Sequence, residues 1–205
     1  MRKSSASTTS STAQNSPTVI WPFNRNKPTE TGAEFYIRDA AMADAKAVIQ
    51  FKHRMWRQMY ADLKDDAFFE KAEATIPEQV QFWQSRINHG DKIWLAEDLR
   101  ERIVGTIHAG TQQSDQTTTF AELYGLKGYA EIRFFYLDDP AAQTTVGQEL
   151  LVQAVGNKPA ITWLSGTAPL VEANLHQAGF EPLGEPVEPS TEPWQGVPRQ
   201  AMVRR

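Results

Sequence analysis

Apolar positions recur along the chain at helical spacing in some stretches, and this spacing predicts where the helices lie. Residues 45–60 carry apolar side chains every three or four positions, which is typical of one face of an amphipathic helix. Thr75 and Glu78 have the spacing of a capping box, with Pro77 between them. They predict a second helix, which should end near residues 89–90.

Short stretches rich in branched and aromatic residues predict the strands. They are residues 34–38, 92–97, 103–109, 129–137 and 160–164. The second and third flank a polar turn and form a predicted hairpin, whereas residues 110–119 are predicted as a loop.

Two more helices and a closing hairpin complete the pattern. The helices are expected at residues 147–155 and 169–178, with Gly179 ending the later one. A hairpin is expected around Trp194-Gln195-Gly196. This mixture of elements predicts an α/β (α+β) domain in which helices cover a central sheet.

The first part of the chain has a different composition. Residues 1–32 are largely Ser and Thr with no apolar periodicity, and their net charge of +3 leaves −7 for the rest of a chain whose total is −4. Such a segment buries too little surface to offset its ordering entropy. We therefore expect a disordered tail at 1–32 and one domain at 33–205. The apolar stretch 19–23 either docks on the domain or stays part of the tail.

Composition excludes several functions. The chain has no cysteine, which excludes disulfides, thiolate metal sites and cysteine-based catalysis, and we expect no bound metal. The net negative charge argues against nucleic acid as a partner. No apolar run is long enough to cross a bilayer, and no signal peptide is visible, so we expect a cytoplasmic protein without a membrane. An enzyme or a small-ligand binder remains.

Five short motifs follow one another in a fixed order between residues 34 and 205. They are Tyr36–Asp39 with Asp44-Ala45, Trp56 with Tyr60, Ala130-Glu131 through Pro140–Gln143, Trp163-Leu164, and Gln177–Glu181. In this order they resemble the GNAT N-acetyltransferase superfamily. The resemblance implies a mixed, mainly antiparallel central sheet flanked by helices. It also implies acetyl-CoA as co-substrate.

The segment after the fourth predicted strand is the candidate pyrophosphate site. A strand, a tight turn and a helix direct several backbone N–H groups at one point, where the helix dipole favours an anion. The resemblance implies that residues from this loop bind the acyl-CoA pyrophosphate: Gln143, Thr144, Thr145, Val146, Gly147 and Gln148. The loop is degenerate, because Thr145 stands where the family has its first glycine. It is either an altered coenzyme A site, with the hydroxyls of Thr144 and Thr145 as donors, or only a helix entry.

The resemblance also implies catalytic positions. A backbone N–H near Phe135, Tyr136 or Leu137 would hold the thioester oxygen. Glu131 is the candidate general base, with a raised pKa; the alternative is an exposed charge at the strand end. Glu122 is a weaker candidate. The family's usual tyrosine acid corresponds to Leu175, which cannot give a proton.

Trp56 and Tyr60 share one helix face and either line an acceptor pocket or belong to the core. The negative charge of the domain would favour a cationic acceptor. The resulting hypothesis is an N-acetyltransferase that moves an acetyl group from acetyl-CoA to an unidentified small-molecule or peptide amine, as a monomer or a homodimer. The alternative is a catalytically degenerate GNAT-fold binding or regulatory protein.

Overall fold

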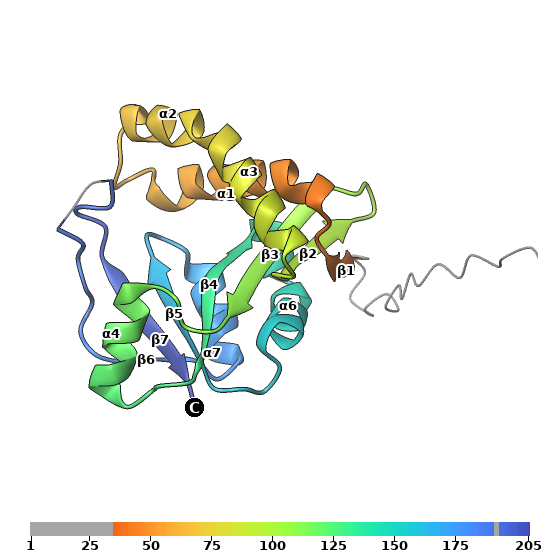
Figure 1. Ribbon diagram of the computed structural model, residues 1–205. Helices are drawn as coiled ribbons and strands as arrows, with labels where there is room; N and C mark the ends of the chain where they lie inside the picture. Colours follow the sequence, from red (N-terminus) through yellow and green to blue (C-terminus); the bar gives the residue numbers. More distant parts are fainter. Residues whose placement is uncertain (1–34, 191–192) are drawn as a thin grey trace, which may run out of the picture.

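Seven strands form one sheet in the computed structural model, which describes residues 35–190 and 193–205 (Figure 1). Their order across the sheet is β1-β2-β3-β4-β5-β7-β6. All neighbouring strands are antiparallel except β4 and β5. The strands are β1 (Phe35–Asp39), β2 (Ile93–Asp98), β3 (Ile103–Gly110), β4 (Ala130–Leu137), β5 (Ala160–Ser165), β6 (Glu181–Pro182) and β7 (Arg199–Arg204).

Helices cover both faces of this sheet. They are α1 (Ala45–Tyr60), which follows the short 3-10 helix η1 (Met42–Asp44), α2 (Asp66–Ala74), α3 (Ile76–Asn88), α4 (Asp115–Tyr124), α5 (Asp139–Ala142), α6 (Val146–Val155) and α7 (Pro169–Gln177). The expectation of a mixed, mainly antiparallel sheet flanked by helices is confirmed. The predicted tail 1–32, including stretch 19–23, lies outside the described residues, so the division of the chain at residue 32 stays a prediction.

The two faces of the sheet bury different helices, as the alternation along the strands requires. Helices α5, α6 and α7 pack on the face that carries Ala96, Ile107, Phe135 and Ala160 in the largest core cluster. On the opposite face, α1 and α3 cover β2 to β4. Helix α4 covers β5 and β7 on that same face. In β5, Ile161 follows Ala160 and therefore points to the opposite face, where it packs against α4. Figure 1 shows α1, α2 and α3 at the top and α4 at the lower left.

Most of the predicted elements are confirmed. The apolar repeat at residues 45–60 forms α1, and the predicted hairpin forms β2 and β3. The predicted end of the second helix is also confirmed, because α3 ends at Asn88 and Gly90 has φ of 96°. Gly179 ends α7 with φ of 82°. At the C-terminal end, a turn at Trp194 precedes β7, whose neighbours include the two-residue strand β6.

Three helices were not predicted, namely α2, α4 and the four-residue α5. The predicted loop at 110–119 runs into α4, which begins at the cap Ser114 and ends at Gly125, whose φ is 69°. This helix buries only Thr117 and Ala121, so it has no long apolar stripe. Helix α2 buries only Phe69 and was missed for the same reason. The cap signals were present in both cases, since an aspartate or a serine precedes each helix.

The predicted capping box at the start of α3 is wrong. Thr75 occupies the cap position, but its side chain makes no cap hydrogen bond. Its hydroxyl instead donates to Ala72 O at 2.7 Å and accepts from Gln79 Nε2 at 2.7 Å. Because α2 ends directly at this residue, the hydroxyl satisfies the end of α2 rather than the start of α3.

Candidate active site

The parallel strands β4 and β5 pair along only three residues and then diverge. The last pair is Ile132 with Thr162. A β-bulge at Arg133, where β3 pairs with Phe134 and then with Ile132, increases the bend of β4 at this point. We call this divergence the splay. It leaves the edges of both strands without a neighbouring strand over the rest of their length.

Two backbone amides of β4 point into the splay. Asp138 N donates to Val104 O on β3 at 2.9 Å. Because alternate residues of a strand direct their N–H groups to opposite sides, the amides of Phe135 and Leu137 face the side of β5, beyond the point where pairing ends. Of the three predicted positions for an oxyanion donor, these two have the required direction, whereas the amide of Tyr136 faces β3.

A cavity of about 350 Å³ lies at the end of the splay. Its lining comes from the end of β4, the start of α5, the loop before α7, the start of α7 and the second half of α1: Leu137, Asp139, Thr167, Ala168, Pro169, Leu170, Val171, Met55, Gln58 and Met59. We call it the splay cavity. The loop before α7 is fixed to α1, since Thr167 N and Oγ1 both donate to Met59 O at 3.0 Å.

A glycine allows this close approach between the loop and α1. Gly166 has φ of 70°, and a Cβ atom there would lie 2.6 Å from Met59 O and from Tyr60 Cε1. Any side chain at this position would therefore push the loop away from the end of α1. Gly166 thus sets one wall of the splay cavity.

The loop between β4 and α6 keeps free backbone donors without the expected glycine. Thr145 has φ of −75° and ψ of −8°, an ordinary right-handed conformation that a threonine adopts without strain. The short helix α5 makes the turn instead. Among the described residues, the amides of Thr145, Gly147 and Gln148 have no hydrogen-bond partner. These donors stand at the N-terminus of α6, where the helix dipole favours an anion.

The threonine hydroxyls of this loop already have acceptors within the protein. Thr144 Oγ1 donates to Ala141 O at 2.7 Å and accepts from Val146 N at 3.2 Å, and Thr145 Oγ1 donates to Glu149 Oε1 at 2.9 Å. To donate to a phosphate, as predicted, each hydroxyl would have to leave its present acceptor. Gln143 is exposed and its Nε2 donates to Asp139 O at 3.3 Å.

Gly147 serves helix packing rather than the turn. A Cβ atom on it would lie 2.7 Å from Asn174 Cγ and 2.9 Å from Leu137 Cδ1. Asn174 is buried, and its Nδ2 donates to Ala142 O and to Leu170 O, both at 2.9 Å. The glycine thus lets α6 approach the asparagine that connects α5 with α7.

Three carboxylates surround the same loop. Asp138 Oδ1 accepts from Ala141 N at 3.1 Å, and burial raises the pKa of this carboxyl above its usual value. Asp139 and Glu149 stand in the first turns of α5 and α6. Their charges oppose an anion at the free amides, so they weaken the site that the helix N-terminus forms.

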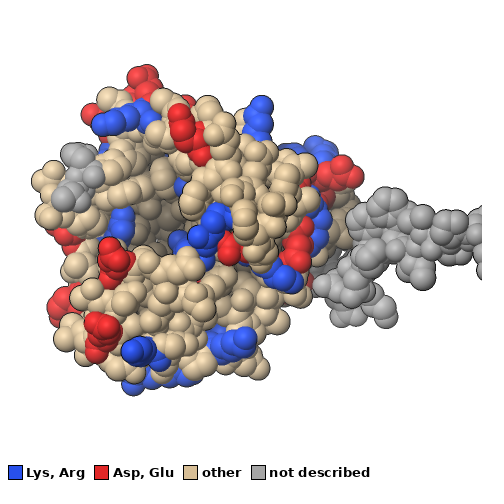
Figure 2. All heavy atoms as spheres, in the orientation of Figure 1, with Lys and Arg blue, Asp and Glu red and all other residues tan. Residues whose placement is uncertain are grey.

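A second recess lies on the other face of the sheet, between α1 and α4. Figure 2 shows the surface hollowed there, with Lys and Arg atoms around and inside the depression. We call it the hollow. We assign to it a cluster of side chains that contact one another and come from α1, β4, the turn before β7, and β7: Lys52, Trp56, Tyr136, Trp194 and Arg199. Tyr136 is next to Leu137 in β4, so the hollow and the splay cavity approach each other at the splay.

The predicted acceptor residues lie in this hollow. Trp56 Nε1 donates to Tyr136 Oη at 2.8 Å, and the rings of Trp56 and Trp194 meet edge to face at 4.8 Å. Tyr60 is buried and packs on Trp194 at 5.4 Å. Trp56 is only half-buried, so it forms a wall of the hollow, whereas Tyr60 supports it from behind. Tyr136, predicted for its amide, contributes its side chain here.

Glu131 does not have the properties of the predicted base. Its carboxylate is buried, with Oε1 accepting from Ser114 Oγ and Thr117 Oγ1 at 2.6 Å and Oε2 accepting from Gln113 N at 2.9 Å. Burial raises the pKa of this carboxyl, but the hydrogen bonds from Ser114, Thr117 and the backbone lower it by a larger amount. The pKa of Glu131 therefore lies below its usual value. The predicted raised pKa is therefore wrong, and so is the alternative of an exposed charge. Glu131 holds the start of α4 against β4.

Leu175, at the position where the family has its acid, is buried in the core and has no catalytic chemistry. Glu122, the weaker base candidate, is exposed on α4. Sequence reasoning missed Lys52, Trp194 and Arg199. Lys52 was concealed by its place on an otherwise apolar helix face, and the other two lie at the far end of the chain.

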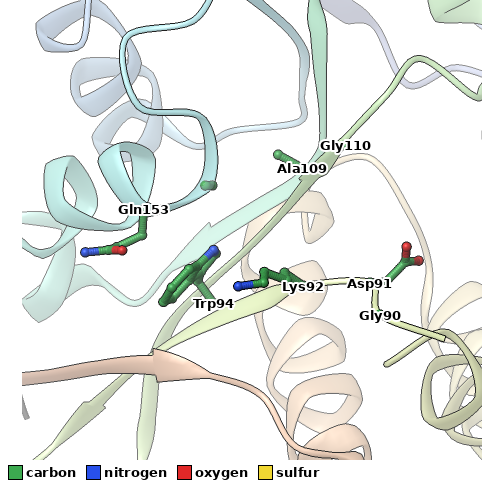
Figure 3. A pocket seen from close by; sticks show the side chains of 8 residues that line it. Gly90, Asp91, Lys92, Trp94, Ala109, Gly110 and Gln153 are labelled. Atoms are coloured by element: carbon green, nitrogen blue, oxygen red, sulfur yellow. The ribbon is translucent and has the colours of Figure 1, made fainter. Parts of the chain in front are cut away.

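A further cavity of about 380 Å³ lies at the opposite end of the sheet (Figure 3). The close-up shows Lys92 extending toward Trp94, Gln153 of α6 above them, and Asp91 pointing away. It lies by the start of β2 and the end of α6, whereas the splay is at the end of β4. It takes no part in the splay or the loop before α6.

Within residues 35–190 and 193–205, no group of three or more His, Asp or Glu side chains is arranged to bind a metal ion. No helix of the same residues has the length and apolar character needed to cross a bilayer.

Comparison with known proteins identifies the fold. No protein-family model matches the sequence, and no curated protein does. Solved structures do match. The PaiA N-acetyltransferase from Thermoplasma acidophilum in complex with coenzyme A has a TM-score of 0.58 at 15% identity, over 84% of this chain and 99% of that one.

Two other structures agree with it. A GNAT-superfamily phosphinothricin acetyltransferase from Sinorhizobium meliloti, in complex with acetyl-CoA, has a TM-score of 0.56 at 20% identity, over 84% of this chain and 87% of that one. A ribosomal-protein-alanine N-acetyltransferase from Brucella melitensis has a TM-score of 0.54 at 17% identity, over 82% and 98% of the two chains. The chain therefore has the fold of the GNAT-superfamily N-acetyltransferases, and the resemblance seen in the sequence is confirmed at the level of the fold.

Proposed function

We propose that this protein is an N-acetyltransferase that uses acetyl-CoA as the acetyl donor and an amine as the acceptor. The observation that carries the proposal is the splay. It combines unpaired amides of β4, a cavity at the strand ends and free amides at the start of α6 in one region. Structures with the same fold are bound to coenzyme A or acetyl-CoA, which supports the same use here.

The residues of the splay fit the two polar parts of acetyl-CoA. In this proposal the amides of Thr145, Gly147 and Gln148 bind the diphosphate, and the splay cavity accepts the thioester arm. The amides of Phe135 and Leu137 face the place where the carbonyl oxygen would acquire negative charge. A preorganised donor of this kind contributes about 3 kcal/mol to the stabilisation of the transition state.

The transfer itself requires one bond to form and one to break. The amine nitrogen attacks the thioester carbon, the C–N bond forms, the C–S bond breaks, and the nitrogen loses a proton. We propose that water accepts this proton, since the oxygens of Glu131 are already occupied by donors from Ser114, Thr117 and Gln113. The thiolate then takes a proton from water, because Leu175 has none to give.

The second candidate is a GNAT-fold binding or regulatory protein without turnover. The carboxylates Asp139 and Glu149 beside the loop favour it, as does the buried Leu175. Both candidates use the same fold and differ in whether the acetyl group leaves the donor. A homodimer and a location in the cytoplasm stay predictions with either.

Calorimetric titration with acetyl-CoA tests the donor, and release of free coenzyme A tests the transfer. Because the chain has no cysteine, a thiol reagent detects only released coenzyme A, with no signal from the protein. We expect saturable binding and amine-dependent thiol release. Binding without release for any amine would favour the second candidate, and no binding at millimolar acetyl-CoA would exclude both acetyl transfer and a role in sensing acetyl-CoA.

The matched variant is Gly166→Val. It should push the loop before α7 away from α1, displace this wall of the splay cavity and abolish acetyl-CoA binding while the sheet remains folded. Gly128→Ala is its control, because Gly128 also has a positive φ, of 90°, but a Cβ atom there meets nothing within 4 Å. If both variants bind acetyl-CoA like the wild type, the splay cavity is not the donor site.

A further inference from the structure

Two cations flank the pair of tryptophans in the hollow. Lys52 Nζ lies 4.4 Å from the centroid of the Trp56 ring, and Arg199 Cζ lies 5.3 Å from that of Trp194. The two rings contact each other at 4.8 Å. Lys52 comes from α1 and Arg199 from β7, so the two charges enter the hollow from its wall and from its floor.

These cations have polar partners but no carboxylate. Lys52 Nζ donates to Gln79 Oε1 at 2.8 Å, and Arg199 Nη1 donates to Gln116 Oε1 at 3.1 Å. No carboxylate of residues 35–190 or 193–205 lies within 4 Å of either one. Both are half-buried, and burial lowers the pKa of Lys52 to about 8. Arg199 also has a buried Nε without a partner.

Two cations without a counter-charge lower the stability of the folded protein unless an anionic ligand neutralises them. A cation that is removed from water without a counter-charge destabilises the folded protein. Amide partners such as Gln79 and Gln116 satisfy single protons and do not neutralise the charge. Three protons of Lys52 and five of Arg199 leave donors for a further acceptor.

We propose that the hollow binds an amine that also carries an oxyanion, a carboxylate or a phosphonate, held between Lys52 and Arg199 over Trp56 and Trp194. The acetylation of this amine rests on the proposed function, whereas the anion site is inferred from the geometry of the hollow alone. It reverses the expectation from the net charge, which favoured a cationic acceptor. Tyr136 belongs to the hollow, and the next residue of β4, Leu137, lines the splay cavity. An amine beside Tyr136 would therefore lie close to the acetyl group of acetyl-CoA.

The first experiment does not depend on acetyl transfer. Trinitrobenzenesulfonate labels neutral lysine amines at pH 8, and mass spectrometry measures the rate at each lysine. The probes are sodium glutarate and sodium phosphate, against sodium chloride at equal ionic strength. We expect either probe at four times its dissociation constant to slow labelling of Lys52 about fivefold by mass action. Labelling of Lys92 should not change; it is the control, since it also lies over a tryptophan, at 5.5 Å from Trp94, but outside the hollow.

Arg199→Met should remove this protection, whereas Lys92→Met should keep it. Equal labelling of Lys52 with and without both anions would overturn the proposal, whatever the protein does with acetyl-CoA. Protection of Lys52 in a protein that releases no coenzyme A would uphold the anion site and refute the transferase function. The two proposals therefore fail separately.

The second experiment uses transfer. L-Leucine and L-phenylalanine are compared with their α-amides, and 2-aminoethylphosphonate with its dimethyl ester, as acetyl acceptors. We expect kcat/KM for the charged member of the preferred pair to exceed that of the neutral one about tenfold or more, since a hydrogen bond to a charge is worth this ratio. The preferred pair identifies carboxylate or phosphonate. Lys52→Met should abolish the preference. A wild-type enzyme that accepts the neutral members equally well would overturn the proposal.

Discussion

The indole Nε1 of Trp56 donates a 2.8 Å hydrogen bond to the hydroxyl of Tyr136, connecting α1 with the diverging end of β4. The tyrosine is half-buried, and removal of its hydroxyl from water raises the pKa of that hydroxyl well above the usual value. The bond fixes one wall of the hollow relative to its floor, so Trp56 is both a structural and a lining residue.

Loss of this bond should lower stability. Tyr136→Phe leaves the indole N–H without an acceptor, and we expect the free energy of unfolding to fall by about 1 to 2 kcal/mol. Urea unfolding followed by circular dichroism measures it. Tyr124→Phe, on a partly exposed tyrosine of α4, is the control and should stay within about 0.5 kcal/mol. Equal stability of the Tyr136 variant and the wild type would mean that the bond contributes nothing.

Glu131 should matter for stability rather than for the chemical step. Glu131→Gln places an amide where donors from Ser114, Thr117 and Gln113 converge, and should cost about 1 to 3 kcal/mol. Glu122→Gln is the exposed control on α4. A fall of about a hundredfold or more in kcat of the folded variant, the size typical of a lost general base, would contradict this assignment.

The same variant has a defined pH dependence. The folded-state pKa of Glu131 lies below its usual value of 4.5, so the stability it contributes is fully present above the unfolded-state pKa. That stability is lost as the pH falls through the folded-state pKa. The difference in unfolding free energy between the wild type and Glu131→Gln should therefore be constant near neutral pH and shrink below about pH 4.5. A difference that grows on acidification would contradict the lowered pKa.

Gly147 and Asn174 should behave as a coupled pair. Gly147→Ala brings a methyl group against Asn174 Cγ and Leu137 Cδ1, and we expect a loss of about 1 to 3 kcal/mol. In the background of Asn174→Ala the same change should cost less, because only Leu137 Cδ1 still meets the methyl group. Thermal or urea unfolding of the four proteins gives the coupling energy. Additive effects would show that the two residues do not restrict each other.

The loop before α6 should bind coenzyme A more tightly when its negative charge is reduced. Glu149→Gln removes a carboxylate from the first turn of α6 and weakens the hold on the hydroxyl of Thr145. We expect the dissociation constant to fall about two- to fivefold at low salt and less at high salt. Calorimetric titration measures it, with the exposed Glu185→Gln as control. Weaker binding by the Glu149 variant would place the diphosphate elsewhere.

The elements that bury a long apolar stripe could be predicted from the sequence, and those that bury little could not. Val48, Ile49 and Met55 repeat at helical spacing and lie in the core, so α1 was evident. Helix α4 buries only Thr117 and Ala121 and was read as a loop. Its serine cap was present, but a cap without a stripe does not distinguish a helix from a turn.

The parts of the site that depend on the order of strands and helices along the chain could be predicted. The parts that depend on side chains far apart in the sequence could not. Strand, turn and helix after β4 indicated the loop, but no local pattern revealed that Thr145 adopts a right-handed conformation. The same limit explains Glu131, whose donors Ser114 and Thr117 come from the missed helix. Lys52 and Arg199 lie over two tryptophans that contact each other, although the two cations come from α1 and β7, which are far apart in the sequence.

The short contact between β4 and β5 has a consequence for synthesis on the ribosome. Three residue pairs join the half of the sheet formed by β1 to β4 to the half formed by β5, β6 and β7. The first half consists of neighbouring antiparallel strands and can form while the second is still being translated. Helix α4 is made before its apolar partners Ile161 and Val203. A nascent chain therefore exposes this helix until Val203 has been made, which makes α4 a segment that a chaperone would encounter.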